Sequence, residues 1–179
     1  MSGAKAPTSA LSQRMLRKAG HWVEVVETWQ TFVHDPKRKI ELLQEGRPIA
    51  RRADLFGVAD LLAVKLGGRP LLVQTTTKTN LAAHRNKALA ATTIQPKEID
   101  ERQTPYSTLS ILLGGGFDYV IHAWWKDETV NRWRVIEEVA VVLPEGVEQS
   151  WTARTPLSGG YWLAFQNRNP DPIQRRLAL

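Results

Sequence analysis

The sequence predicts an α/β protein with a mixed central β-sheet flanked by helices, in the order αβββαββ. The first observation is a pair of strand-like segments, 58–64 and 71–77, joined by a turn at Gly67 and Gly68, which makes them antiparallel neighbours. The second is the Ala-rich helical run 81–91, which is followed by two more strand patterns at 117–126 and 132–143. A helix that crosses over between strands predicts a mixed sheet with helices on both sides.

The first third of the chain supplies a helix and a strand. Residues 9–19 place Leu11, Met15 and Leu16 at helical spacing, and Gly20 is a typical helix stop. Residues 21–33 alternate and are rich in β-branched and aromatic side chains, which predicts one strand. The charged stretch 37–52 predicts a loop or a short helix. We expect residues 1–8 to form a flexible leader and 9–143 to form the core.

The second strand of the hairpin begins apolar after Pro70 and becomes polar toward Thr77. Asn80 is a suitable N-cap for helix 81–91. Residues 106–113 predict a short helix that stops at the glycines 114–116, and the last two strands surround a turn at 127–131. We expect residues 144–179 to be a loop-rich C-terminal extension packed on the core.

Composition limits the function classes. The chain has 179 residues, enough for one domain with a core, and no cysteine, which excludes disulfide frameworks, thiolate zinc sites and cysteine nucleophiles. This suits a reducing compartment, so we expect a cytoplasmic protein, and the apolar runs are too short for a membrane partner. The net charge of +6 favours a polyanionic partner such as DNA, although an ordinary basic surface would give the same charge.

The predicted hairpin contains the candidate metal-binding residues. Asp60 lies on its first strand and Gln74 on its second, and an acid and an amide oxygen on adjacent strands can share one hard cation. Asp54 precedes Asp60 beyond Gly57 and approaches the same point. We therefore expect Asp60, Gln74 and Asp54 as metal ligands. The alternative is structural: an Asp at a strand start accepts backbone hydrogen bonds, and a polar strand end is simply a strand leaving the core.

Asp60, the glycine-bearing hairpin and the strand from Leu71 to Thr76 resemble the core of the PD-(D/E)XK nuclease superfamily, over about residues 9–143. Its motif is an Asp, then Glu-x-Lys or Gln-x-Lys on the next strand, with a helix behind. By position, the resemblance makes Asp60 the metal-binding acid and Gln74 the second ligand. It implies a restriction-endonuclease-like core, Mg²⁺ or Mn²⁺ as cofactor and DNA as substrate. The closest likeness is to phage and Holliday-junction-resolvase-like members, whose frequent dimers make a homodimer one expected arrangement.

The sequence departs from this motif at Thr76, which stands where the lysine should be. The loss removes a positive group from the transition state, where such stabilisation is usually large. Glutamine in place of glutamate removes a negative charge worth roughly 4 kcal/mol beside a cation at about 4 Å and an effective dielectric of ~20. Two lysines can replace the missing one: Lys78, on the same face if the strand continues, and Lys87, about one helical turn beyond His84.

The leading hypothesis is a metal-dependent DNA endonuclease with catalytic residues Asp60, Gln74, Thr76, Lys78 and Lys87. We expect Arg51, Arg52, Arg85, His84 and Lys126 to contact DNA, mainly through charge on the phosphates. One alternative is the same fold with a decayed site, acting as a DNA- or protein-binding module. Another is a small structural or assembly protein whose basic charge is incidental.

Overall fold

The computed structural model of the chain describes residues 8–26, 28–31, 43–44, 47–48, 50–91, 107–146, 154–157 and 159–168. Its helices are α1 (Thr8–Lys18), α2 (Leu81–Ala90) and α3 (Thr108–Gly114), with a 3₁₀ turn η1 (Lys78–Asn80) before α2. The strands of the main sheet are β1 (Trp22–Val25), β6 (Leu61–Val64), β7 (Leu71–Thr77), β8 (Asp118–Asp127), β9 (Arg132–Pro144), β10 (Arg154–Leu157) and β11 (Tyr161–Asn167). Two small ribbons pair β2 (Thr28–Thr31) with β5 (Ala50–Ala53) and β3 (Leu43–Gln44) with β4 (Arg47–Pro48).

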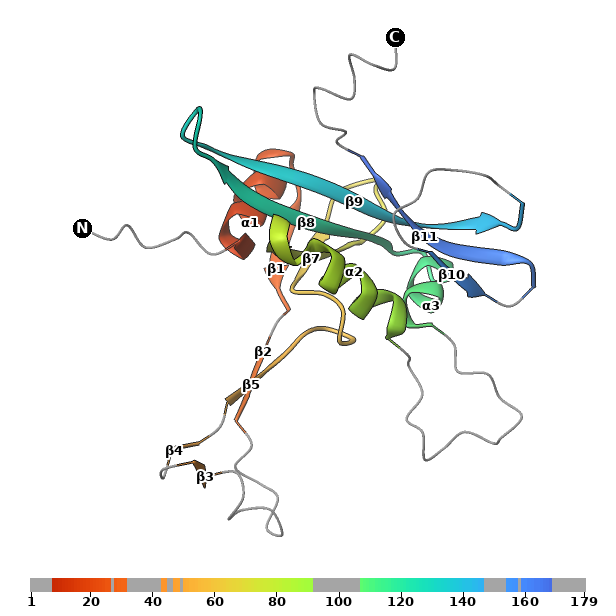
Figure 1. The fold of residues 1–179 in the computed structure, drawn as a ribbon, viewed down its shortest axis with the longest axis horizontal. Coiled ribbons are helices and arrows are strands. Elements are labelled where there is room, and N and C mark those ends of the chain that lie inside the picture. Colours follow the sequence, from red (N-terminus) through yellow and green to blue (C-terminus); the bar gives the residue numbers. More distant parts are fainter. Residues whose placement is uncertain are drawn as a thin grey trace.

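The main sheet has seven strands in the order β1-β6-β7-β8-β9-β11-β10 (Figure 1). Strands β7 and β8 are parallel, and the other pairs among the described strands of this sheet are antiparallel. Helix α2 lies in the connection that returns the chain to the start of β8. The expected α/β fold with a mixed sheet and flanking helices is therefore confirmed. Within the described residues, no helix is long and apolar enough to cross a membrane.

Each face of the sheet has its own apolar core. Neighbouring residues of a strand point to opposite faces, and β7 shows this with two fully buried residues. Leu72 packs with Leu81, Leu109 and other residues of the α2 and α3 side. Val73 packs on the α1 side, with Leu16. The β7 residues that follow, beginning with Gln74 and Thr75, therefore also alternate between the two helical layers.

Helix α1 is held on its face by a buried hydrogen-bonded cluster. The indole Nε1 of Trp124 donates to Ser12 Oγ at 2.8 Å, and His122 Nδ1 lies 3.0 Å from the same oxygen. Ser12 and His122 are fully buried. Because a buried hydroxyl that loses its partners costs about 1–3 kcal/mol, this cluster fixes α1, and with it Thr8, relative to β8.

Helix α2 is held on the opposite face by a buried ion pair. Arg85 donates from Nε to Glu138 Oε2 at 2.8 Å and from Nη2 to Oε1 at 2.6 Å. Their side chains are only 11% and 5% exposed. A bidentate pair fixes orientation as well as distance, so it sets the rotation of α2 against β9.

Two strands differ from the prediction. The expected strand 21–33 is divided, because β6 offers partners to β1 only as far as the Val25–Leu61 pair, after which β2 pairs with β5. The expected strand 58–64 begins only at Leu61. Positive φ angles at Phe56 (53°) and Gly57 (72°) bend the chain into a turn before it, and Asp60 lies at the following bend.

The chain after Pro144 also differs from the expected loop-rich extension. Strand β11 pairs with β9 from the Tyr161–Pro144 pair to the Asn167–Glu138 pair, and β10 pairs with β11. Leu163 and Phe165 of β11 are buried in the core on the α2 side. The described part of this segment is therefore an integral edge of the sheet, and the order αβββαββ does not describe the whole chain.

The Arg85–Glu138 pair gives a stability prediction. Glu138→Gln leaves the Arg85 charge buried without a counter-ion, so we expect the free energy of unfolding to fall by about 3–5 kcal/mol in urea denaturation. Glu128→Gln is the matched control, since Glu128 is exposed and its oxygen lies 3.7 Å from Lys126 Nζ. The control should change stability by less than about 1 kcal/mol. Equal losses in both variants would contradict the role of the buried pair.

Candidate active site

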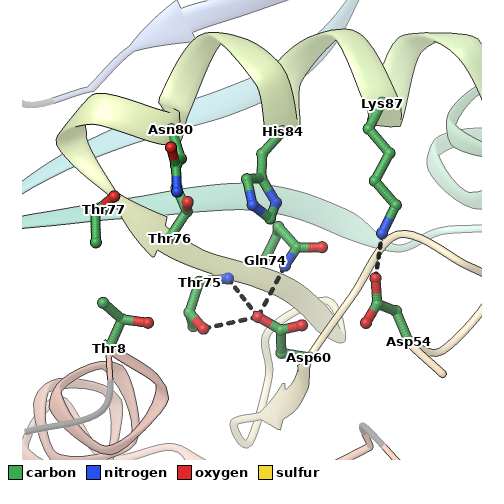
Figure 2. Close-up of a pocket in the computed structure, with 10 residues that line it drawn as sticks. All are labelled: Thr8, Asp54, Asp60, Gln74, Thr75, Thr76, Thr77, Asn80, His84 and Lys87. Carbon is green, nitrogen blue, oxygen red and sulfur yellow. Dashed lines mark hydrogen bonds and ion pairs between the residues drawn. The ribbon is translucent and has the colours of Figure 1, made fainter. Parts of the chain in front are cut away.

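A cleft of about 380 Å³ opens beside the second half of β7. Strand β6 pairs with β7 only at Leu71–Val73, whereas β8 accompanies β7 along its whole length. Residues 74–77 therefore have a neighbouring strand on one side only, and polar side chains fill the other side (Figure 2). The cleft is lined by Thr8, Asp54, Asp60, Gln74, Thr75, Thr76, Thr77, Asn80, His84 and Lys87.

Asp60 takes the place of the missing strand at this edge. Its Oδ2 accepts from the Thr75 backbone N–H at 2.7 Å, the Thr75 hydroxyl at 2.7 Å and Gln74 Nε2 at 2.8 Å. Asp60 is 4% exposed. Charge-assisted hydrogen bonds are about twice as strong as neutral ones, so three on one oxygen hold the carboxylate in a single orientation.

Gln74 and Thr76 continue the face of β7 that α2 covers, and both are almost fully buried. The structure thus brings Gln74 to Asp60, as the hairpin predicts. Thr76, at the position of the motif lysine, also lines the cleft and contributes a hydroxyl but no charge.

Helix α2 contributes a positively charged side chain, Lys87, to the cleft. The ammonium of Lys87 forms an ion pair with Asp54 Oδ2. The Asp54 side chain is 13% exposed, whereas that of Lys87 is 53% exposed. The Phe56–Gly57 turn brings Asp54 back toward Asp60, so both acids and this lysine meet although they come from three different segments of the chain.

His84 lies one helical turn before Lys87 and also faces the cleft (Figure 2). Burial, the main cause, and the nearby Lys87 charge lower the pKa of His84, while Asp60 and Asp54 raise it by less. Its Nδ1 is buried and has no hydrogen-bond partner among the described residues. The lowered pKa favours the neutral imidazole, which donates from one ring nitrogen and accepts at the other.

Three of the expected site residues lie elsewhere. Strand β7 ends at Thr77, so Lys78 begins η1, and its Nζ lies 4.8 Å from the Trp125 ring centre instead of in the cleft. Arg85 is buried against Glu138, so it is not available for the phosphate contact that the sequence predicts. Lys126 lies beside Glu128 near the β8–β9 turn.

The remaining two expected DNA contacts, Arg51 and Arg52, belong to β5, and their side chains lie outside the described part of the structure.

The sequence prediction missed several cleft residues. Thr75 lies on the opposite face of β7 from Gln74, yet its backbone N–H and its hydroxyl both donate to Asp60. This contact could have been predicted only by recognising that β6 ends early and leaves the edge of β7 unpaired. Thr8 and Thr77 carried no signal. Asn80 was expected to cap α2, but its side chain makes no capping hydrogen bond and lines the cleft.

The donor set can be tested against the implied cation. Mg²⁺ is commonly held by one or two carboxylates, with waters and substrate phosphates completing its shell. No described residue hydrogen-bonds to Asp60 Oδ1 or to Gln74 Oε1, so both oxygens are available. Asp54 supplies a second carboxylate. These residues fit a Mg²⁺ or Mn²⁺ that the substrate helps to hold. They do not make a protein-only site, since the described residues contain no group of three His, Cys, Asp or Glu suited to a metal.

Comparison of the chain with protein-family models, with curated proteins and with solved structures finds no match.

The electrostatics of the cleft give a pH prediction. We expect the pKa of His84 to lie below its ordinary value of about 6.5, as measured by NMR of its ring protons. Lys87→Met removes a nearby positive charge and unpairs Asp54, so it should raise the pKa of His84. Lys18→Met, at the exposed end of α1, is the matched control and should leave it unchanged. A His84 pKa that does not respond to Lys87→Met would show that the two side chains do not share the cleft.

Proposed function

We propose that the protein hydrolyses phosphodiester bonds of DNA with the help of a divalent cation, as an endonuclease of the PD-(D/E)XK type. The observation that carries the proposal is the meeting of Asp60, Gln74 and Lys87 in one cleft. They supply the residue types of the superfamily motif, an acid, an amide oxygen and a lysine. The lysine comes from α2 instead of from the strand.

The fold offers further support. The cleft adjoins an antiparallel hairpin, and α2 crosses between the parallel strands β7 and β8, as the restriction-endonuclease-like core implied by the resemblance requires. The basic charge of the chain suits a polyanion, and such binding weakens steeply with salt. A homodimer remains part of the proposal by analogy with resolvases alone.

The protein's own contribution begins with a fixed acid. Gln74 and Thr75 hold Asp60 in place before substrate arrives, so little reorganisation is needed during the reaction. Asp60, with Asp54 and Gln74, would hold Mg²⁺ or Mn²⁺, which supplies an activated water and neutralises phosphate charge. The second carboxylate oxygen of Asp60, Oδ1, faces the side of the cleft where Asp54 and Lys87 lie (Figure 2).

Lys87 supplies the positive charge that Thr76 cannot. Its exposed ammonium is paired with Asp54 in the absence of substrate and can exchange that carboxylate for a phosphate oxygen. The charge then lies where negative charge develops on the phosphate during attack. The buried Arg85–Glu138 pair supports this role indirectly, because it fixes the face of α2 that carries Lys87.

A second candidate is a DNA-binding module that has lost cleavage. The favouring observation is that the cleft already satisfies its charges: three donors bind Asp60, and Lys87 pairs with Asp54. Such a site is stable without a cation. The two candidates share the fold and the DNA partner and differ in turnover.

A cleavage assay tests the proposal. Linear, single-stranded and four-way-junction DNA are incubated with Mg²⁺ or Mn²⁺ and the wild-type protein, Asp60→Asn or Lys87→Met. Loss of the Asp60 or Lys87 charge should each slow cleavage by about 10²–10³-fold, the usual effect of removing one transition-state contact. Circular dichroism confirms that the variants are folded.

The matched controls remove the same charges elsewhere. Asp118 pairs with Arg69 at 3.5 Å on the surface, and Lys18 ends α1, so Asp118→Asn and Lys18→Met should cleave like wild type. Binding without cleavage in every metal would overturn the enzyme and favour the binding module. Neither binding nor cleavage would exclude both and leave a structural role.

A further inference from the structure

The cleft has a second end that the proposed hydrolysis does not use. In Figure 2, Lys87 and Asp54 lie at one end, Asp60, Gln74 and His84 lie between, and the other end holds Thr8, Thr76, Thr77 and Asn80. We call this the threonine end. None of its four side chains is charged. This end has no carboxylate to neutralise a cation, whereas its hydroxyl and amide groups can donate hydrogen bonds to an anion.

Thr76 gives the clearest sign that a ligand belongs there. The residue is only 4% exposed, yet no described residue hydrogen-bonds to its hydroxyl. Its hydroxyl is not sealed off from solvent, so it faces the open space of the cleft. A ligand in the cleft can therefore form a hydrogen bond with Thr76, which valine in the same volume could not offer.

A helical N-terminus lies at the same place. The 3₁₀ turn η1 runs directly into α2, with the Leu81 N–H bonded to the Lys78 carbonyl, so the helical stretch begins at Lys78, after Thr77. It has no acidic residue in its first turn, and neither Thr77 nor Asn80 caps it with a side-chain hydrogen bond. Helix N-termini carry partial positive charge and unpaired N–H groups, which favour phosphate. The partial charges and the unpartnered Thr76 hydroxyl therefore indicate the same class of ligand.

We propose that the threonine end is a phosphate subsite, formed by Thr76, Asn80 and the start of the continuous η1–α2 helical stretch at Lys78. Asn80, the last residue of η1, and Lys87 on α2 are seven residues apart, about 10 Å along the helix axis. One phosphate cannot contact both ends, so the phosphate here is a second one on the strand whose scissile phosphate lies near Asp60. The subsite takes either an internal phosphate or a 5′-terminal phosphate of that strand. This placement rests on the proposed function, whereas phosphate binding itself does not.

The test measures binding in EDTA, so that neither cleavage nor a bridging cation is needed. Trithymidylate with and without a 5′-phosphate is titrated into ¹⁵N-labelled protein, and the amide shifts of residues 76–82 are followed. We expect saturable shifts there. Thr76→Val should weaken binding about tenfold, the usual effect of losing a hydrogen bond to a charged group. Thr155→Val, on β10, is the matched control and should bind like wild type.

A second variant separates binding from folding. Asn80→Asp places a negative charge before α2, which favours the helix but repels a phosphate. We expect a protein at least as stable as wild type that has lost trithymidylate binding. Tighter binding of the 5′-phosphorylated probe assigns the subsite to a terminal phosphate, and equal binding of both assigns it to an internal one.

Three outcomes would overturn the subsite: wild-type affinity in both variants, shifts confined to the Lys87 end, or no binding by the wild-type protein. The proposed function fails separately. Binding that depends on Thr76 without any cleavage would sink the nuclease and leave the subsite. Cleavage that is unaffected by both variants would do the reverse.

Discussion

The structure of the cleft depends on the hydrogen bonds between the Asp60 carboxylate and β7. At Asp60 the chain that precedes β6 turns away, and β7 would be left with unpaired edge groups from Gln74 onward. One carboxylate oxygen replaces the missing strand by accepting from the Thr75 N–H, the Thr75 hydroxyl and Gln74. The edge is thereby closed to further strand pairing but open to a ligand. A carboxylate held by β7 in this way keeps one orientation toward the cleft, as the proposed function requires.

The rest of the fold keeps the walls of this cleft in place. Ser12 and its two buried partners fix α1, and the Arg85–Glu138 pair fixes α2. Thr8 of α1 and Asn80 at the end of η1 thus line the cleft from opposite faces of the sheet. The resulting site runs from the full charges of Asp54 and Lys87 to the neutral hydroxyls and helix ends near Thr76. This arrangement suits an extended polyanion better than a small compact ligand.

The sequence predicted the elements that are determined by neighbouring residues, such as single strands, helices and tight turns. The apolar run before Thr77 and the alanine-rich helix after it correspond to β7 and α2. The hairpin turn likewise predicted that Asp60 and Gln74 would meet. The choice between Lys78 and Lys87 was not local, because it depended on where β7 ends. The burial of Arg85 also could not be predicted from local sequence, since its partner Glu138 is 53 residues away along the chain. Of the strands missed after Pro144, β10 has only four residues, and β11 follows directly on the turn at Gly159 and Gly160, whose composition predicts a loop.

The proposed function is tested most directly by locating the site at which a divalent cation binds. Mn²⁺ is titrated into ¹⁵N-labelled protein with a short phosphorothioate-linked DNA strand present, and paramagnetic broadening is followed residue by residue. We expect the Thr75 amide, the Gln74 side-chain amide and the His84 ring to broaden first, while Thr129 at the β8–β9 turn stays sharp. Broadening centred elsewhere, or none near Asp60 at any Mn²⁺ concentration, would contradict the proposal that this cleft is a metal-dependent active site.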